Sequence, residues 1–305
     1  MFTTLEPVLA IRDAWKSYGQ TPALKGINLD LHAGELLGFL GPNGAGKTTL
    51  IQCLAGRARL DSGQIRFPQQ GKQQRQQLGV VPQRLALYED LTAEQNLFAF
   101  AKLHAVPRRE LRERVDAALH WSNLETRRRK LVNTFSGGMK RRLNIACSVL
   151  HRPCILLLDE PTVGVDPQSR ERIYEMLSGM RDQGTAVMLT THHLDEAQHR
   201  CDRIAIVDQG QVILSGTLQQ LIADTIGSDQ RLSVRFHSPP TILPSGFSLD
   251  KDRTLGTCTL TNVADELPAL MESLQHSQGP IDQVMLQGPT LQNVFLHLTG
   301  KELRE

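Results

Sequence analysis

The chain has 305 residues, of which 40% are hydrophobic and 22% are charged, and its formal net charge is +2. This length leaves room for two domains with sizeable cores, and the nearly balanced charge does not mark a nucleic-acid binder. The first residues lack the pattern of a secretory signal, and no apolar run approaches the roughly 18 residues that cross a bilayer. We therefore expect a soluble protein that reaches a membrane only through a partner.

The predicted elements begin with strands. Residues 8–40 contain short apolar stretches, at 8–11 and in the alternating segment 27–31, and this pattern is typical of antiparallel strands with one solvated face. Residues 36–40 are continuously apolar and predict a strand that is buried on both faces. A helix is expected after the next loop, ending at Gly56.

The middle of the chain is predicted to be helical and then to alternate between strands and helices. The glutamine-rich residues 69–77 are expected to form a solvated connection. Residues 89–150 have a helical pattern, in which Thr92 and Gln95 resemble a capping box. The later elements follow in chain order: strands at 78–81, 155–158, 186–190, 204–207 and 211–214, and helices from Pro167 and Leu194.

The pattern changes near Gly227 and predicts a small α+β unit. Its expected elements are strands at 231–236, 255–260 and 281–286, a helix at 264–275, and a short helix at 290–298 capped by Thr290. We place the domain boundary here, with residues 1–227 as the main domain and residues 228–305 as an accessory domain.

Five cysteines are scattered along the chain without a CxxC pair: Cys53, Cys147, Cys154, Cys201 and Cys258. Metal-binding cysteines normally come in pairs roughly two to four residues apart. The odd number and wide spacing favour reduced thiols in a cytoplasmic protein over disulfides or a metal site.

A glycine-rich loop joins the strand at 36–40 to the following helix and reads Gly41-Pro42-Asn43-Gly44-Ala45-Gly46-Lys47-Thr48, with Thr49 next. Glycines let the backbone curl and point its N–H groups at a polyphosphate, and the helix start adds its positive end. Lys47 is placed to reach the β- and γ-phosphates, and the Thr48 hydroxyl is placed to ligate Mg²⁺. The loop predicts binding of ATP.

Two adjacent carboxylates follow the apolar strand at 155–158. Successive strand residues point in different directions, so Asp159 and Glu160 are expected to do different work. We predict that Asp159 helps to hold Mg²⁺ and that Glu160 polarises the attacking water. Combined with the phosphate-binding loop, the pair predicts ATP hydrolysis.

The segment that decides the family precedes this strand and reads Phe135-Ser136-Gly137-Gly138-Met139. It resembles the signature of ATP-binding-cassette (ABC) ATPases, with Phe135 and Met139 replacing the usual Leu and Gln. The resemblance covers residues 8 to about 225. It implies an α/β P-loop NTPase core of the RecA-like kind with an antiparallel β subdomain and a helical subdomain.

The resemblance assigns roles to further residues. Tyr18 falls where an aromatic ring stacks on adenine, with Trp15 as a rival. Gln83 matches the glutamine that contacts Mg²⁺ or the attacking water and senses a partner. His192 matches the histidine that contacts the γ-phosphate, with His193 as a rival. The segment Val163-Gly164-Val165-Asp166 matches the loop called the D-loop, in which Asp166 belongs to the nucleotide site.

In the family, the signature of one chain caps ATP held by the loop of another. The resemblance therefore implies a head-to-tail homodimer in which Ser136, Gly137 and Gly138 complete the partner's site. The alternative is that Ser136 is only an ordinary helix cap. The basic runs 127–130 and 140–142 are interpreted as solvated helix faces, because no aromatic residues are interleaved with them.

Three kinds of ABC protein contain such a cassette: the ATPase subunit of a transporter, a soluble ABC protein acting on ribosomes or DNA, and an isolated nucleotide switch. The separation of Lys47 from Asp159 leaves no room for a long coiled coil, and the chain has one cassette. The segments 136–143, 162–167 and 289–300 look like those of the daunorubicin-resistance and nodulation-factor exporter ATPases. This resemblance implies a peripheral protein on the cytoplasmic face of the inner membrane, held by a separate permease and making no contact with the cargo. The alternative is a soluble ABC switch on a non-transport partner.

Overall fold

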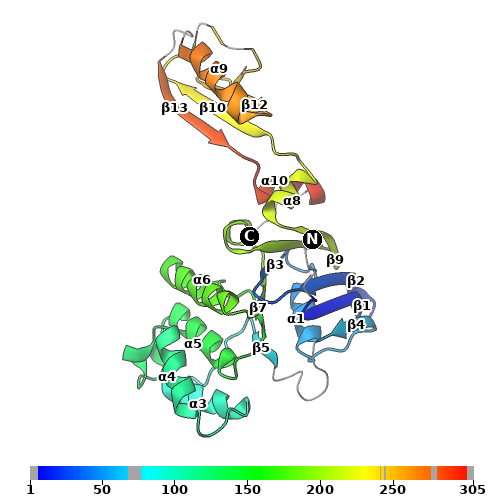
Figure 1. Ribbon diagram of the computed structural model, residues 1–305, viewed down its shortest axis with the longest axis vertical. Coiled ribbons are helices and arrows are strands. Elements are labelled where there is room, and N and C mark those ends of the chain that lie inside the picture. Colours follow the sequence, from blue (N-terminus) through cyan, green and yellow to red (C-terminus); the bar gives the residue numbers. More distant parts are fainter. Residues whose placement is uncertain (1–5, 68–76, 241, 244, 276–279, 301–305) are drawn as a thin grey trace. The chain divides into compact units, whose positions relative to one another are not determined.

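The computed structural model describes residues 6–67, 77–240, 242–243, 245–275 and 280–300 (Figure 1). The described residues divide into two compact units. Unit 1 extends to Thr217, and unit 2 begins at Leu218. The predicted boundary at residue 228 stays a prediction; the structural division falls earlier because the short helix α8, Leu218–Ala223, contacts the last helix, α10, Leu291–Thr299.

A six-stranded sheet forms the centre of unit 1, in the order β5-β6-β7-β3-β8-β9. Its first five strands in that order are parallel, and β9 pairs with β8 in the antiparallel sense. The bounds are Leu36–Leu40 for β3, Leu78–Val81 for β5, Ile155–Asp159 for β6, Ala186–Thr191 for β7, Arg203–Asp208 for β8 and Gln211–Gly216 for β9. The predicted α/β core is confirmed.

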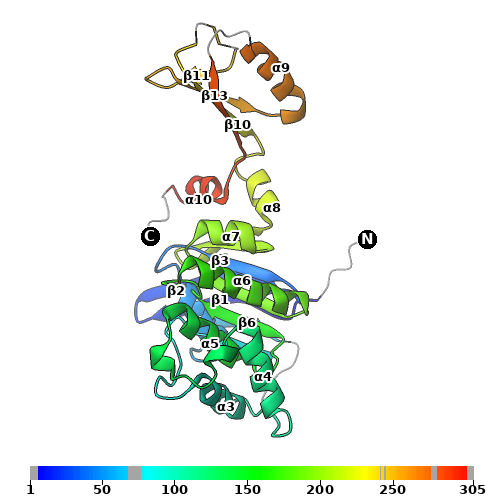
Figure 2. The ribbon, with the colours of Figure 1, turned by 90° about the vertical axis from the view of Figure 1, so that its left-hand side faces the viewer.

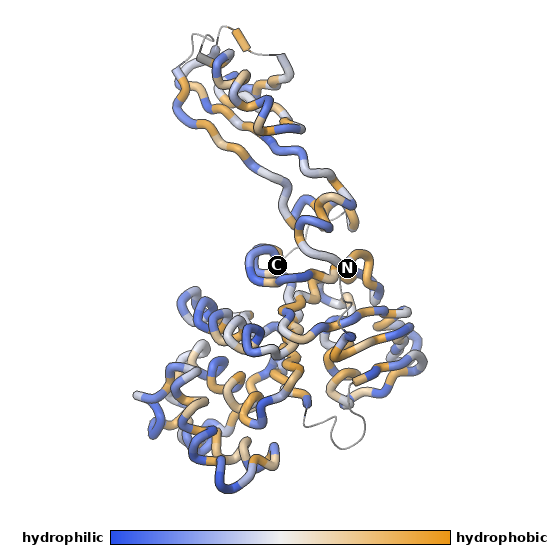
Figure 3. The backbone as a smooth tube through the Cα atoms, viewed as in Figure 1, coloured by the Kyte–Doolittle hydropathy of each residue, from blue (hydrophilic) through white to orange (hydrophobic). Residues whose placement is uncertain are grey.

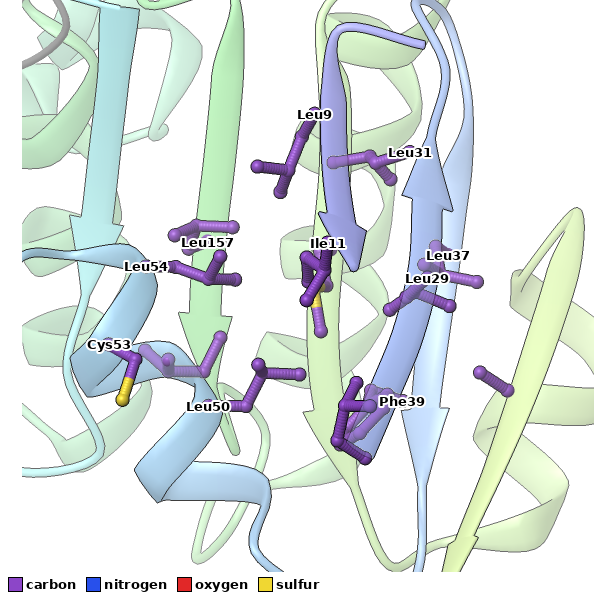
Figure 4. Packing of buried hydrophobic residues seen from close by; sticks show 14 of the residues in the cluster. Leu9, Ile11, Leu29, Leu31, Leu37, Phe39, Leu50, Cys53, Leu54 and Leu157 are labelled. Carbon is purple, nitrogen blue, oxygen red and sulfur yellow. The ribbon is translucent and has the colours of Figure 1, made fainter. Parts of the chain in front are cut away.

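Both faces of this sheet are covered, which explains why its parallel strands are largely apolar without alternation. On one face, α1, Lys47–Leu54, and a three-stranded antiparallel sheet pack against Leu37, Phe39 and Leu157 (Figure 4). On the other face, α5, Gly137–Val149, and α6, Pro167–Asp182, pack against Leu156 and Leu158. Figure 2 shows α6 lying along the sheet.

The three-stranded sheet has the order β2-β1-β4. Its strands are Leu9–Tyr18 for β1, Thr21–Leu31 for β2 and Ser62–Arg66 for β4. Leu9, Ile11 and Leu29 point into the core that it shares with the central sheet (Figure 4). The predicted antiparallel strands are confirmed here. The glutamine-rich connection predicted at 69–77 lies almost entirely outside the described residues.

The helical segment has a core of its own. It contains α3, Ala93–Leu103, α4, Leu111–Trp121, two short 3₁₀ turns at Glu125–Arg127 and Val132–Thr134, and the face of α5 that carries Leu143, Ala146 and Cys147. Thr92 caps α3 in the predicted capping box, because its hydroxyl accepts from Gln95 N while the Gln95 side chain accepts from Thr92 N. Hydrophobic residues gather in the interior strands and on the inward faces of the helices (Figure 3).

Besides α8 and α10, the described part of unit 2 contains a four-stranded antiparallel sheet with one helix against it. The strand order is β11-β12-β10-β13, with β10 at Gln230–Phe236, β11 at Ser248–Leu249, β12 at Leu255–Leu260 and β13 at Ile281–Gln287. The helix α9, Val263–Gln275, covers Leu232, Val234 and Phe236. Thr290 caps α10 as predicted, since its hydroxyl accepts from Asn293 N.

Candidate functional site

The loop between β3 and α1 has the backbone geometry of an anion site. Gly44 and Gly46 have φ of 84° and 99°, in the left-handed region. A Cβ on Gly46 would lie 2.4 Å from Ala23 O, and a Cβ on Gly41 would lie 2.2 Å from Val207 O. Only glycine fits these positions. The first N–H groups of α1 have no side-chain cap, so they remain available to a negatively charged ligand.

Lys47 is buried beneath this loop. Its Nζ donates to Gly41 O at 2.8 Å and to Pro42 O at 3.1 Å, and it lies 3.4 Å from Glu160 Oε1. Burial lowers the pKa of Lys47, and the neighbouring Glu160 opposes that shift. A buried ammonium group has lost most of its hydration, so a second anion beside it stabilises its charge. This favours binding of phosphate at the loop.

The predicted acids lie beside the loop. Thr48 Oγ1 donates to Asp159 Oδ1 at 3.2 Å, so the two side chains predicted to hold Mg²⁺ are already neighbours. Glu160 is buried, with Gln83 Nε2 at 2.9 Å from one carboxylate oxygen and His192 Nδ1 at 3.1 Å from the other. Residues from four separate parts of the chain therefore converge at the edge of the sheet where the parallel strands have their carboxyl ends, and α/β proteins bind ligands at this edge.

The donor set fits Mg²⁺. Within the described part of the chain, no group of three or more His, Cys, Asp and Glu could hold a metal ion by itself. Mg²⁺ is typically held by one or two side-chain oxygens together with waters and substrate phosphates. The Thr48 hydroxyl and the Asp159 carboxylate supply such oxygens, so the arrangement suits an ion that arrives with a nucleotide.

A cavity of about 210 Å³ marks the ligand side of this cluster, lined by Asn43, Gly44, Lys47, Thr48, Gln83 and Glu160 among others. A second hollow, of about 320 Å³, reaches Asp159 and Arg84 on the other side of Thr48. A larger one of about 520 Å³ lies between α4, α5 and α6, but none of the predicted site residues lines it. The chemistry, rather than the volume, identifies the site.

Tyr18 and Trp15, the two candidates for adenine stacking, differ in their surroundings. Tyr18 ends β1 with 50% of its surface exposed, and its hydroxyl donates to Gln52 of α1 at 3.3 Å. Trp15 is 41% exposed, and its indole N–H donates to Asp13 at 2.7 Å. The contact with α1 places the Tyr18 ring beside the helix that starts at the phosphate loop, which favours Tyr18.

The signature residues do not line the cavities around Lys47. Ser136 caps α5, and its hydroxyl accepts from Met139 N at 3.3 Å. Asp166 caps α6 and accepts from Ser169 N at 2.9 Å; this backbone bond lowers the pKa of its carboxyl. A Cβ on Gly138 would lie 2.1 Å from Ser169 Oγ. The signature and the D-loop are therefore packed together, while the phosphate loop belongs to a separate cluster.

The interpretation of residues 140–142 as a solvated face was wrong. Arg141 is buried, and its guanidinium donates to Pro82 O at 2.9 Å and Gln83 O at 2.8 Å. Arg142 donates to Ser122 O at 2.6 Å, at the end of α4. Pro82, Gln83 and Ser122 lie outside the strands and helices, so these arginines supply hydrogen bonds to carbonyls at the ends of elements and in loops. Charge alone does not reveal this, because the carbonyls come from distant parts of the chain.

Thr190 is a further residue of the site that the sequence pattern did not reveal. It is fully buried, and its hydroxyl accepts from Glu160 N at 3.0 Å and donates to Asp159 Oδ1 at 2.7 Å. The available signal was a polar residue at the end of an otherwise apolar strand, directly before Thr191 and His192.

None of the described helices is both long enough and apolar enough to cross a bilayer. The sequence model of the family described as ABC transporter matches residues 24–163. The daunorubicin resistance ATP-binding protein DrrA3 of Streptomyces coeruleorubidus is 38% identical, with 98% of each chain covered. The Nod factor export ATP-binding protein I of Paraburkholderia xenovorans is 36% identical, with 95% of this chain and 96% of that protein covered.

Solved structures agree on the fold of unit 1. CbiO1 from Clostridium perfringens, part of the ABC transporter complex cbiONQ, has a TM-score of 0.66 at 32% identity and covers 72% of this chain and 92% of its own. The cassette MJ0796, solved as a dimer in a post-hydrolysis state with ADP and Pi, has a TM-score of 0.61 at 26% identity. The match covers 68% of this chain and 98% of the MJ0796 chain. Because relatives at 38% and 36% identity match nearly the whole chain, and because the site has the geometry described above, the chain belongs to the ATP-binding proteins of the ABC transporter family and is an ATPase subunit.

Proposed function

We propose that this protein powers an exporter: it binds ATP with Mg²⁺, pairs head to tail with a second copy, and drives a separate membrane permease. The observation that carries the proposal is the separation of two half-sites within one chain. Lys47, Thr48 and Glu160 share one cluster, whereas Ser136 and Asp166 belong to another. A second copy in the opposite orientation supplies the missing half to each site.

Each residue of the first cluster has a proposed task. Lys47 and the loop N–H groups hold the β- and γ-phosphates. Thr48 and Asp159, with Gln83, hold Mg²⁺, which neutralises charge on the phosphates. Tyr18 stacks on adenine. The loop residues from Gly41 to Thr49 surround the phosphates, and the Ser136–Gly138 segment of the second copy closes the site from the other side.

Glu160 is proposed to act as the general base, and His192 to contact the γ-phosphate. The geometry supports this, because His192 Nδ1 lies 3.1 Å from the Glu160 carboxylate, so the two side chains act at one place. A carboxylate that orients the attacking water accelerates in-line transfer to that water.

The first prediction tests Glu160. Glu160→Gln preserves shape and hydrogen-bonding reach but removes the base, so ATP turnover is expected to fall by about 10²-fold or more while ATP binding is retained. Turnover is measured by phosphate release, and mass in solution by light scattering with and without ATP. A doubled mass that requires ATP supports the head-to-tail dimer. Full turnover in this variant would overturn the assignment of Glu160.

The second prediction concerns the permease. We propose that this protein docks beneath the membrane-spanning chain through the surface around Gln83 and the helical segment, and that this contact holds it at the cytoplasmic face of the inner membrane. Co-expression with the membrane protein encoded next to it is expected to shift this chain to the membrane fraction and to co-purify the two in detergent.

The soluble-switch alternative predicts another outcome for the same experiment: the chain stays in the supernatant although the neighbour is expressed and inserted. Export rather than import is supported by relatives that carry resistance and Nod factor export names. The cargo path is assigned to the permease, so no residue of this chain is proposed to contact the cargo.

A further inference from the structure

The peptide of Glu160 has an unusual conformation for its position. Seven non-glycine residues among those described have positive φ, and Glu160, at 46°, is the only buried one. Exposed residues in turns adopt this region at modest cost, whereas a buried side chain that does so must be held there by its surroundings. The contacts around Glu160 show what holds it.

One contact comes from the neighbouring strand. Thr190 lies opposite Asp159 in the parallel β6–β7 pair. Its hydroxyl accepts from Glu160 N at 3.0 Å and donates to Asp159 Oδ1 at 2.7 Å. One buried hydroxyl therefore fixes both the peptide that carries Glu160 and the carboxylate before it.

A second contact fixes the chain just after Glu160. Thr162 Oγ1 donates to Glu196 Oε2 at 2.7 Å, and Tyr174 Oη donates to the same oxygen at 2.7 Å. Arg170 Nε lies 3.3 Å from the other oxygen, Glu196 Oε1. Glu196 belongs to α7, Leu194–Arg200, which starts directly after His192 and His193. A single buried carboxylate thus ties the segment that follows Glu160 to the helix that follows His192.

We propose that Thr190 and Glu196 are positioning residues for ATP hydrolysis. Thr190 fixes the left-handed peptide of Glu160 from the strand side, and Glu196 fixes the distance between the loop carrying Thr162 and the helix after His192. Together they hold the Glu160 carboxylate against His192 before any nucleotide arrives. A base that is already in position loses less conformational entropy on reaching the transition state. The inference rests on the proposed role of Glu160.

The first test is Thr190→Val, which keeps the shape of the side chain and removes both hydrogen bonds. The turnover number for ATP is expected to fall by about fivefold to twentyfold, with KM for ATP changed less than twofold, because the phosphate loop is not touched. Thr190→Ser restores the hydroxyl and is expected to recover most of the turnover. Thr225→Val is the matched control, since it removes a hydroxyl that bonds only to the carbonyls of Leu221 and Ile222 in unit 2.

The second test uses Glu196→Leu, which removes both carboxylate oxygens, with Thr162→Val. Each single variant is expected to lower the turnover number without raising KM, and the double variant is expected to be no worse than the more affected single one, because both remove the same tie. Thermal unfolding of every variant shows whether the fold is retained. If the losses in the double variant multiply, the two residues do not act through one contact and the proposal for Glu196 fails.

A third arm separates this inference from the proposed function. Thr190→Val is combined with Glu160→Gln, and no further loss of the residual turnover is expected if Thr190 acts by positioning Glu160. A further loss would show that Thr190 acts through its other partner, Asp159, and would overturn the positioning role. If Glu160→Gln is inactive while Thr190→Val keeps full turnover, the positioning role fails and the base remains. If Glu160→Gln keeps full turnover, the proposed function of Glu160 fails first.

Discussion

At the scale of single residues, the site depends on charges that are buried before the ligand binds. Lys47, Asp159 and Glu160 are each less than a tenth exposed. Such groups are tolerated because they are paired: Lys47 with Glu160 and loop carbonyls, Asp159 with two hydroxyls. The residues proposed to bind and hydrolyse ATP are therefore also residues whose charges must be balanced for unit 1 to fold.

His151 carries a residue-scale prediction on pH. It stacks on His104 with ring centroids 4.1 Å apart, and burial lowers its pKa to about 4 from 6.5. A lowered folded-state pKa means that the unfolded chain takes up the proton first. This contribution to stability is therefore present above pH 6.5 and is lost as pH falls towards 4.

We expect the free energy of unfolding to drop by roughly 1–2 kcal/mol more in the wild-type protein than in His151→Gln between pH 7 and pH 4.5, after allowance for the partial exposure of the ring. Urea unfolding followed by tryptophan fluorescence measures the difference. Identical pH slopes for the two proteins would contradict the prediction. Because the comparison is a difference, carboxylates that titrate in both proteins cancel.

At the scale of elements, several boundaries follow from local chemistry. Thr92, Ser136 and Thr290 each begin a helix with a side-chain oxygen that accepts from the backbone three residues later. Gly46 begins α1 without a cap, and this is the one helix start proposed to receive phosphate within the chain. The helices α4 and α7 also start without a side-chain cap, so the glycine-rich loop before Lys47, and not the missing cap alone, distinguishes the start of α1.

The cap of α3 gives an element-scale prediction. Thr92→Ala removes one half of the capping box and is expected to lower the free energy of unfolding by about 1 kcal/mol, while Thr92→Ser keeps the hydroxyl and most of the stability. Chemical denaturation measures both. ATP affinity is expected to be unchanged, since α3 does not line the cavities around Lys47. Equal stability for the alanine and serine variants would show that the cap contributes nothing.

At the scale of the whole molecule, the proposed head-to-tail dimer leads to a complementation test. Lys47→Ala disables the loop of its own chain but leaves the signature intact, and Ser136→Arg does the reverse. Each variant alone is expected to be inactive. In an equal mixture, about half of the dimers are mixed and each has one intact site, so about a quarter of wild-type turnover is expected to return.

Phosphate release is measured for each variant and for the mixture at equal total protein. Lys47→Ala mixed with a second loop variant, Thr48→Ala, is the control, because no mixed dimer of these two has an intact site. Activity in that control, or none in the Lys47→Ala and Ser136→Arg mixture when both proteins are folded, would contradict the head-to-tail arrangement.

The sequence alone determined the elements and the chemistry that local pattern carries. The glycine-rich loop, the apolar strand before Asp159 and the caps at Thr92 and Thr290 depend on neighbours within a few residues, so their spacing is enough to predict them. The resemblance to the ABC family, carried by short motifs such as Ser136-Gly137-Gly138, identified the fold and the activity before any distance was known.

Only the tertiary structure decided which distant groups meet. The burial of Arg141 against the carbonyls around Gln83, the bridge of Thr190 between Asp159 and Glu160, and the tie from Glu196 to Thr162 join segments far apart in the chain. Such contacts depend on strand order and helix packing, and a sequence read residue by residue contains neither. The positive φ of Glu160 belongs to the same class, since surrounding contacts impose it against local preference.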